Sequence, residues 1–402
     1  MLRGLIIATF TALLVLAAGA GGLQWWVKDS LRTPLVLPAG DSHIMMVERG
    51  SSLYSVARRL HAEGFVSSPL PLQLYGRLAV TDAIQAGEYR IMAGDTPLDL
   101  LGKLLRGEVV LHRVTFPEGR TVVQWLEIVA EHPVLSAHLP TMANLEALVA
   151  ESGVTESDVA ESSVAESGEA AVEGWFFPDT YIFPRERRAL DIFRQAHQRM
   201  RTVLDEEWRQ RQAGLPLASP YEALILASIV ERETGAPWER GEIAGVFVRR
   251  LDKGMRLQTD PTVIYGLGER FEGNLTRAHL QEDTDFNTYR IAGLPPTPIA
   301  NPGRQAIHAA LNPAAGSSLY FVAKGDGSHQ FSDTLQQHNR AVREYQLNRR
   351  ADYRSSPSPG AGSGAEQSEN VGAGESGEKQ SSGEPPDVEQ DRGGQDIDRG
   401  AP

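Results

Sequence analysis

The chain has 402 residues, of which 41% are hydrophobic and 23% are charged. That length allows two or three domains, and that composition excludes both a wholly disordered chain and a polytopic membrane protein. There is no cysteine, which excludes disulfides, thiolate metal ligands and cysteine nucleophiles.

The net charge of −13 comes mainly from two low-complexity stretches. Residues 355–402 hold ten acidic and three basic side chains, and residues 151–173 hold seven acidic side chains and no basic one. The remaining chain is nearly neutral, so nucleic acid is not an expected partner. We predict that residues 351–402 form a disordered acidic tail, and that residues 136–172 form a connecting segment containing an acidic Glu/Ser repeat.

The amino-terminal segment lacks charged residues between Arg3 and Lys28. A helix of that length spans about 36 Å, enough for a bilayer core of about 30 Å, and Trp25 and Trp26 would lie in an aromatic belt. Residues 1–27 are therefore predicted to be a cytoplasmic amino terminus and a single transmembrane anchor. The positive charges of Arg3 and of the amino terminus would keep that end in the cytoplasm and leave the remaining domains outside. The alternative is a signal peptide cleaved near Ala18-Gly19-Ala20.

Small α+β modules are expected after a proline-containing stalk at residues 28–42. Within residues 43–135, a glycine and a hydroxyl residue precede a helical apolar pattern three times, with short strand candidates between them. Residues 47–57 resemble the opening of a LysM glycan-binding module, which suggests a LysM-like region over 43–135. A capped helix after a turn explains the same residues equally well.

The motif Glu-Gly-Trp-Phe-Phe-Pro-Asp-Thr-Tyr at residues 173–181 opens the part of the chain that is richest in motifs. Its four aromatic side chains could stack on sugar rings. They could equally anchor a hydrophobic core, and the sequence leaves both alternatives open.

A helix with a complete start signal follows, with Ser219 as N-cap and Pro220 at the first position. Its apolar stripe is extended by Glu233, whereas Glu231 lies about 160° away around the helix. Partial burial and the negative end of the helix dipole would raise the pKa of Glu233, as a general acid requires. The alternative is a solvent-facing Glu233 paired with Arg232 or Arg240.

Polar side chains set among turn residues fill the loops that follow, at residues 254–266, 286–289 and 293–303. Such loops commonly carry binding residues on a rigid scaffold. Their Asn, Gln, Thr and Tyr side chains suit an uncharged, hydroxyl-rich ligand better than a phosphate.

Four of these segments together resemble the endolytic murein transglycosylase (YceG-like) family: Leu-Ala-Ser-Ile-Val-Glu-Arg-Glu-Thr at 226–234, Leu-Gln-Thr-Asp-Pro-Thr-Val-Ile-Tyr at 257–265, Asn-Thr-Tyr at 287–289 and Gly-Leu-Pro-Pro at 293–296. The resemblance covers nearly the whole chain and implies an α+β catalytic domain over residues 173–350. The acidic repeat and the acidic tail depart from the family pattern, but neither interrupts a matched motif.

The resemblance implies a membrane-anchored endolytic lytic transglycosylase that limits the length of nascent peptidoglycan strands. Its catalytic residue would be Glu233, the second Glu of Val-Glu-x-Glu-Thr. In this class one Glu protonates the oxygen between N-acetylmuramic acid and N-acetylglucosamine, and the carbon-6 hydroxyl closes a 1,6-anhydro ring. Candidates for binding substrate, each of which could instead be structural, are Gln258, Asp260, Tyr265, Asn287 and Tyr289.

Peptidoglycan strands, peptidoglycan synthases and the elongation or division machinery would be its partners by the same resemblance, with no cofactor and no metal. A pyridoxal-phosphate lyase would need a Schiff-base lysine, and residues 174–348 offer only Lys253 and Lys324. No His-Glu-x-x-His pattern supports a metallohydrolase. A non-catalytic, membrane-anchored glycan-binding scaffold is the stronger alternative.

Overall fold

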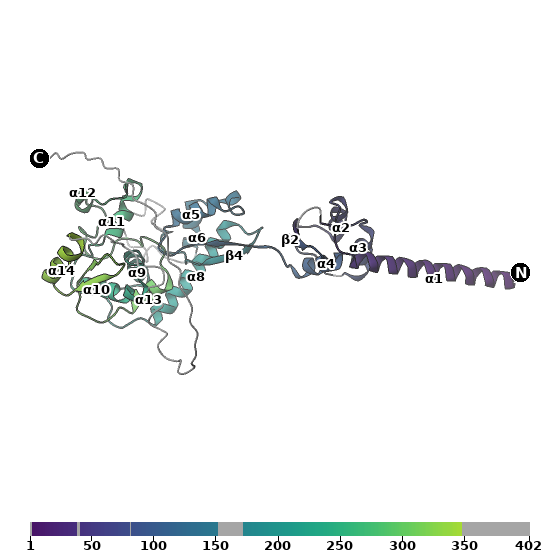
Figure 1. The fold of residues 1–402 in the computed structure, drawn as a ribbon. Coiled ribbons are helices and arrows are strands. Elements are labelled where there is room, and N and C mark those ends of the chain that lie inside the picture. The colour runs from purple at the N-terminus through teal and green to yellow at the C-terminus, as the bar shows by residue number, and fades with distance from the viewer. Residues whose placement is uncertain (1, 38–40, 81, 152–171, 348–402) are drawn as a thin grey trace, which may run out of the picture. The chain divides into compact units, whose positions relative to one another are not determined.

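The computed structural model describes residues 2–37, 41–80, 82–151 and 172–347 (Figure 1). Most of the acidic repeat in the predicted connecting segment, and the whole of the predicted disordered tail, lie outside these residues. Within them, helices alternate with short two-stranded antiparallel sheets, which confirms the mixed α/β class.

Helix α1 (Leu2–Arg32) is long and apolar enough to cross a membrane. The candidate membrane span within it, Thr9–Arg32, has a mean hydropathy of 1.5. No residue in its most apolar stretch is buried by the rest of the protein. The end of the helix differs from the expected stalk, because Leu31 and Leu35 are buried. The backbone N–H of Leu35 also donates to the carbonyl of Asp95 at 2.7 Å. The first residues after the apolar run therefore pack against the next module.

That module has its own hydrophobic core, formed between a sheet and three helices. Strands β1 (Ser42–Val47) and β2 (Gly87–Met92) pair antiparallel. The helices are α2 (Leu53–Ala62), α3 (Leu70–Ala79) and α4 (Pro97–Arg106). The glycine-hydroxyl starts act as expected here, because Ser52 and Thr96 form capping boxes at α2 and α4.

A second core begins at residue 111. Strand β3 (Leu111–Thr115) pairs with β4 (Thr180–Pro184), and α5 (Val122–Glu131), η1 (Ser136–His138) and α6 (Met142–Ala150) follow β3. Sequence grouped residues 111–135 with the LysM-like region, whereas Val114, Phe116 and Trp125 pack in this second core. The paired residues Thr115 and Thr180 lie 65 positions apart in the chain. No local sequence pattern therefore predicts that β3 and β4 pair.

Helix α9 (Pro220–Glu233) is central to the second core, where α8 (Ala189–Arg209), α10 (Arg240–Asp252), α11 (Asp260–Leu267) and α13 (Arg304–Leu311) contact it (Figure 1). Every residue of α9 from Ala223 to Val230 is buried. The helix is therefore apolar all round, rather than along the single stripe that sequence predicted.

The remaining elements complete this core. Strands β5 (Tyr320–Ala323) and β6 (His329–Ser332) pair antiparallel beside α14 (Leu335–Val342). The short elements are η3 (Pro237–Glu239), η4 (Gly268–Arg270), α12 (Arg277–Gln281) and η5 (Arg343–Leu347).

The aromatic motif at 173–181 belongs to the core. Trp175, Phe176 and Phe177 are all buried. Trp175 stacks on Tyr221 with ring centroids 5.6 Å apart, and Phe176 meets Phe193 edge to face at 5.2 Å. These aromatic side chains therefore anchor the core, and the packing leaves Phe176 no surface for a sugar.

The same motif ties distant segments together through the buried carboxylate of Glu173. It accepts hydrogen bonds from the backbone N–H of Val122 at 3.2 Å and from the Asn301 side chain at 2.8 Å. Asn301 also accepts from the Phe176 N–H and donates to the Arg120 carbonyl. One amide thus joins the start of α5, the aromatic motif and the loop before α13.

We predict that Asn301→Ala lowers the free energy of unfolding by about 2–4 kcal/mol, because it removes one hydrogen bond from the buried Glu173 carboxylate and leaves the buried Phe176 N–H without its acceptor. Denaturant unfolding of the detergent-solubilised chain measures the change. The matched control is Asn274→Ala, at an exposed loop position, where less than about 0.5 kcal/mol is expected. Equal losses of unfolding free energy in the two variants would show that the Asn301 side chain does not stabilise the fold through these hydrogen bonds.

Candidate active site

Glu233 is the last residue of α9 and is partly buried. The hydroxyl of Thr259 donates a hydrogen bond to its Oε1. Burial raises the pKa of Glu233 to about 7, and the nearby negative charge of Asp260 adds to this effect. The Thr259 hydrogen bond and the positive charges of His329 and Arg250 act in the opposite direction without cancelling it. The carboxyl therefore holds a proton near neutral pH.

The arginines that could have neutralised Glu233 are engaged elsewhere. Arg232 donates to the carbonyl of Gly119 at 3.0 Å, and Arg240 forms a salt bridge with Glu231 at 3.1 Å. The side chain of Glu231 is only 5% exposed and also accepts from the Gly303 N–H at 2.9 Å. The two neighbouring glutamates thus have opposite surroundings, a cation for Glu231 and a hydroxyl for Glu233.

Hydrogen-bonded threonines hold the loop that carries Thr259. Its backbone N–H donates to the hydroxyl of Thr288 at 3.0 Å, and the hydroxyls of Thr262 and Thr288 lie 2.9 Å apart. All three threonines are buried. Gln258 adopts a φ of 53°, unusual for a residue other than glycine. Thr259 and Thr288 lie within the sequence motifs given above, although neither was among the expected site residues.

Asp260 and Tyr289 meet next to Glu233. The Tyr289 hydroxyl donates to Asp260 Oδ1 at 2.7 Å, and burial together with this carboxylate raises the pKa of Tyr289. Asp260 and Gln258 are exposed, and Tyr289 is partly buried. Asp260 and Tyr289 therefore lie by the carboxyl of Glu233, and Gln258 directly precedes the threonine that donates to it.

Asn287 and Tyr265 are placed differently. Asn287 is fully buried, and its amide donates to the carbonyls of His279 and Glu282 while its oxygen accepts from the Tyr289 N–H. It shapes the loop from inside and presents no group to a ligand. Tyr265 packs edge to face on Phe286, with centroids 5.0 Å apart, and lines a cavity.

Arg250 and His329 also lie near Glu233, and neither was selected from the sequence. Arg250 is buried and donates to the carbonyls of Leu257 and Leu319 at 2.6 and 2.7 Å. The ring nitrogen Nδ1 of His329 lies 2.7 Å from one carboxylate oxygen of Glu239. The other oxygen accepts a hydrogen bond from the backbone N–H of His329. An arginine within α10 and a histidine on β6 carry no local signal that they converge on the end of α9.

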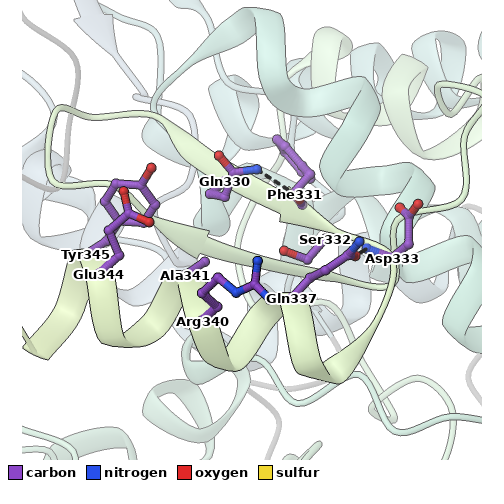
Figure 2. A pocket seen from close by; sticks show the side chains of 9 residues that line it. All are labelled: Gln330, Phe331, Ser332, Asp333, Gln337, Arg340, Ala341, Glu344 and Tyr345. Carbon is purple, nitrogen blue, oxygen red and sulfur yellow. Dashed lines mark hydrogen bonds between the residues drawn. The ribbon is translucent and has the colours of Figure 1, made fainter.

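Several hollows lie among the described residues of the second core, and two of them bear on the site. One, of about 650 Å³, is lined by Tyr265 and by Arg232 and Pro261, the chain neighbours of Glu233 and Asp260. The other, of about 350 Å³, lies over β6 and α14 (Figure 2). Its side chains include Gln330, Gln337 and Arg340, and none of the expected site residues lines it. Of the residues selected from sequence, Tyr265 alone lines the first hollow.

Comparisons with known proteins identify the family of the chain. The model of the YceG-like family matches residues 45–344. An endolytic murein transglycosylase of Bacillus subtilis (strain 168) is 30% identical over 310 residues, which cover 74% of this chain and 83% of the relative. One from Streptococcus pneumoniae (strain D39) is 26% identical over 377 residues, covering 85% of this chain but only 65% of that protein.

A crystal structure of a YceG-like protein from Listeria monocytogenes is also similar, with 29% sequence identity and a TM-score of 0.49. The match covers 75% of this chain and 99% of that one. Because the family match extends over most of the chain and includes every motif around Glu233, the resemblance seen in the sequence is confirmed: the chain belongs to the YceG-like family.

Proposed function

We propose that this chain is an endolytic lytic transglycosylase that cuts peptidoglycan between N-acetylmuramic acid and N-acetylglucosamine, with Glu233 as its acid and base. The observation that carries the proposal is the partly buried carboxyl of Glu233, whose pKa is raised to about 7. The names of the Bacillus and Streptococcus relatives, endolytic murein transglycosylase, supply the substrate and the reaction class.

The reaction needs only one group that first gives and then takes a proton. Glu233 protonates the glycosidic oxygen as the bond from that oxygen to carbon 1 of the muramic ring breaks. The carbon-6 hydroxyl of the same ring attacks carbon 1 and returns its proton to Glu233, which leaves a 1,6-anhydro end. The nucleophile is already attached to the reacting ring, so no water is consumed and proximity favours the attack.

Gln258, Asp260 and Tyr289 are proposed to contact the sugars, because they lie close to Glu233 with accessible polar groups. The negative charge of Asp260 would also favour the positive charge that develops on the sugar ring. Tyr265 is proposed to bind substrate from the wall of the cavity. For Asn287 the buried amide supports a positioning role through the backbone of Tyr289.

The cellular setting is part of the proposal. Helix α1 would be a single-pass inner-membrane anchor with a cytoplasmic amino terminus, which would place the catalytic domain in the periplasm near newly made strands. There the enzyme would limit strand length beside peptidoglycan synthases and the elongation or division machinery. The module around β1 and β2 is proposed to be the LysM-like glycan-binding part, and residues 173–350 the catalytic domain.

A non-catalytic glycan-binding scaffold remains the competing function. It predicts that Glu233 serves only as a structural ion-pair partner. The described contacts favour catalysis instead, because Glu231 takes the salt bridge with Arg240 while Glu233 receives a hydroxyl.

The first test replaces each glutamate separately. Glu233→Gln should lower strand cleavage by about 10²–10⁴-fold, the usual contribution of a general acid. Glu231→Gln should keep most of the activity of the folded protein while lowering its stability, because Arg240 loses a charged partner. The full chain in detergent is incubated with purified murein, and anhydro-muropeptides are measured by mass spectrometry.

Two results would change the proposal. Products with a reducing end would mean that water is the nucleophile and the enzyme is a hydrolase, with Asp260 as the candidate second carboxylate. Equal activity of the wild type and Glu233→Gln would favour the scaffold.

We predict that kcat/KM falls as the pH rises through about 7, because the general acid must be protonated. Thr259→Val removes a hydrogen bond that lowers the pKa of Glu233, so this limb should move to higher pH. Asp260→Asn removes a negative charge that raises the pKa, so the limb should move to lower pH. Limbs that stay in place in both variants would exclude Glu233 as the titrating group.

The same carboxyl should affect stability. Because its pKa is higher in the folded chain than the ordinary value of 4.5, the folded state loses free energy relative to the unfolded state between about pH 4.5 and 7. The Glu233→Gln variant has no ionisable group at this position, so it does not lose this free energy. At pH 8 the variant should be more stable than the wild type by up to about 3 kcal/mol, at about 1.4 kcal/mol per pH unit.

Denaturant unfolding at pH 8 and pH 4 checks this linkage. The difference between variant and wild type should shrink at pH 4, where both folded and unfolded wild type hold the proton. A difference that is the same at both pH values would show that Glu233 has an ordinary pKa.

A further inference from the structure

The cavity of about 650 Å³ near the end of α9 is lined mainly by apolar side chains, together with a few charged ones. Arg232 and Pro261, which line it, are the chain neighbours of Glu233 and Asp260. Glu269 lies exposed on the same lining. The apolar and aromatic wall is formed by Met142, Ile264, Tyr265, Phe271, Phe286 and Ile299.

Arg232 is the unusual member of this lining. Its guanidinium donates to the Gly119 carbonyl, but it takes part in none of the salt bridges found among the described residues. Arg232 is an exposed residue, and partial desolvation of its guanidinium together with the neighbouring positive charge of Arg120 lowers its pKa. An anionic ligand would reduce the repulsion between these two arginines.

The carboxylates of the protein do not fill this role. Glu173 uses its oxygens on the Val122 N–H and the Asn301 amide. Glu118, on the loop that contains Arg120, lies 3.6 Å from Arg240. The cavity therefore offers a cation and an apolar wall to a ligand that carries a carboxylate, and the exposed Glu269 on the same lining forms no salt bridge with Arg232 among the described residues.

We propose that this cavity binds the short peptide attached to the muramic acid residue at the cleavage point, with Arg232 receiving one of its carboxylates. The inference rests on the proposed function, since it takes murein as the substrate. The glycan itself offers only uncharged hydroxyl and acetamido groups, which cannot form a salt bridge with the Arg232 guanidinium. The peptide starts at the lactyl group of the reacting ring and supplies free carboxylates and small apolar side chains within reach of Glu233.

The test compares two substrates, glycan strands that carry peptides and the same strands stripped by an amidase. Wild-type chain should have the higher kcat/KM on peptide-bearing strands. Arg232→Met should lose about tenfold on these strands only, the usual effect of removing one charge-assisted hydrogen bond. Arg232→Lys should keep part of the preference. Arg277→Met is the control, since it removes an exposed arginine that is not among the cavity residues.

A binding measurement separates this inference from the catalytic proposal. The free peptide is titrated calorimetrically into the full chain carrying Glu233→Gln, and adding Arg232→Met should weaken binding about tenfold. If the wild type cuts both strands but Arg232→Met lowers both rates equally, Arg232 only holds Gly119 and the inference fails while the enzyme stands. Peptide binding without strand cleavage would instead overturn the proposed function and leave the cavity's ligand correct.

Discussion

The hydrogen bond between the Thr259 hydroxyl and the Glu233 carboxyl joins the two halves of the candidate site. Helix α9 brings Glu233 from the middle of the core, and the loop before α11 brings Thr259, Asp260 and Gln258. A hydroxyl can donate to a carboxyl without neutralising it by charge, so burial remains the dominant influence on the pKa. An arginine in place of Thr259 would have reversed that balance and left a permanently ionised carboxylate.

Glu231 illustrates the point within the same turn of helix. Both residues are glutamates near the carboxyl end of α9, where the helix dipole disfavours negative charge. Glu231 is compensated by Arg240 and by the Gly303 N–H, which makes it a structural anion between α9, α10 and the loop before α13. Residue type therefore does not decide which glutamate can act as an acid; the partners brought by other elements do.

Local patterns predicted the part of the site that lies on one helix. The N-cap at Ser219 and the position of Glu233 follow from a few adjacent residues. The prediction that α9 has a single apolar stripe was wrong, but Glu233 still ends the helix next to a buried face. Asn287 was selected because polar loop residues commonly bind ligands, and its amide is instead consumed by backbone carbonyls that a buried loop must satisfy. Arg250, His329 and the Thr259–Thr288 contact depend on tertiary packing that no local spacing encodes.

Long-range ties explain why a site built on loops can be held in place. Glu173 and Asn301 fasten the segment around Arg120 to the loop before α13, and Glu231 fastens the same loop to α9. Arg232 then contacts Gly119 in the segment so held. The distance between the carboxyl of Glu233 and the cavity is therefore set by buried polar contacts in the core rather than by the flexible loop surface. A substrate that used both would have its scissile bond and its attached group positioned by one rigid frame, and this is the arrangement that an intramolecular attack by a ring hydroxyl requires.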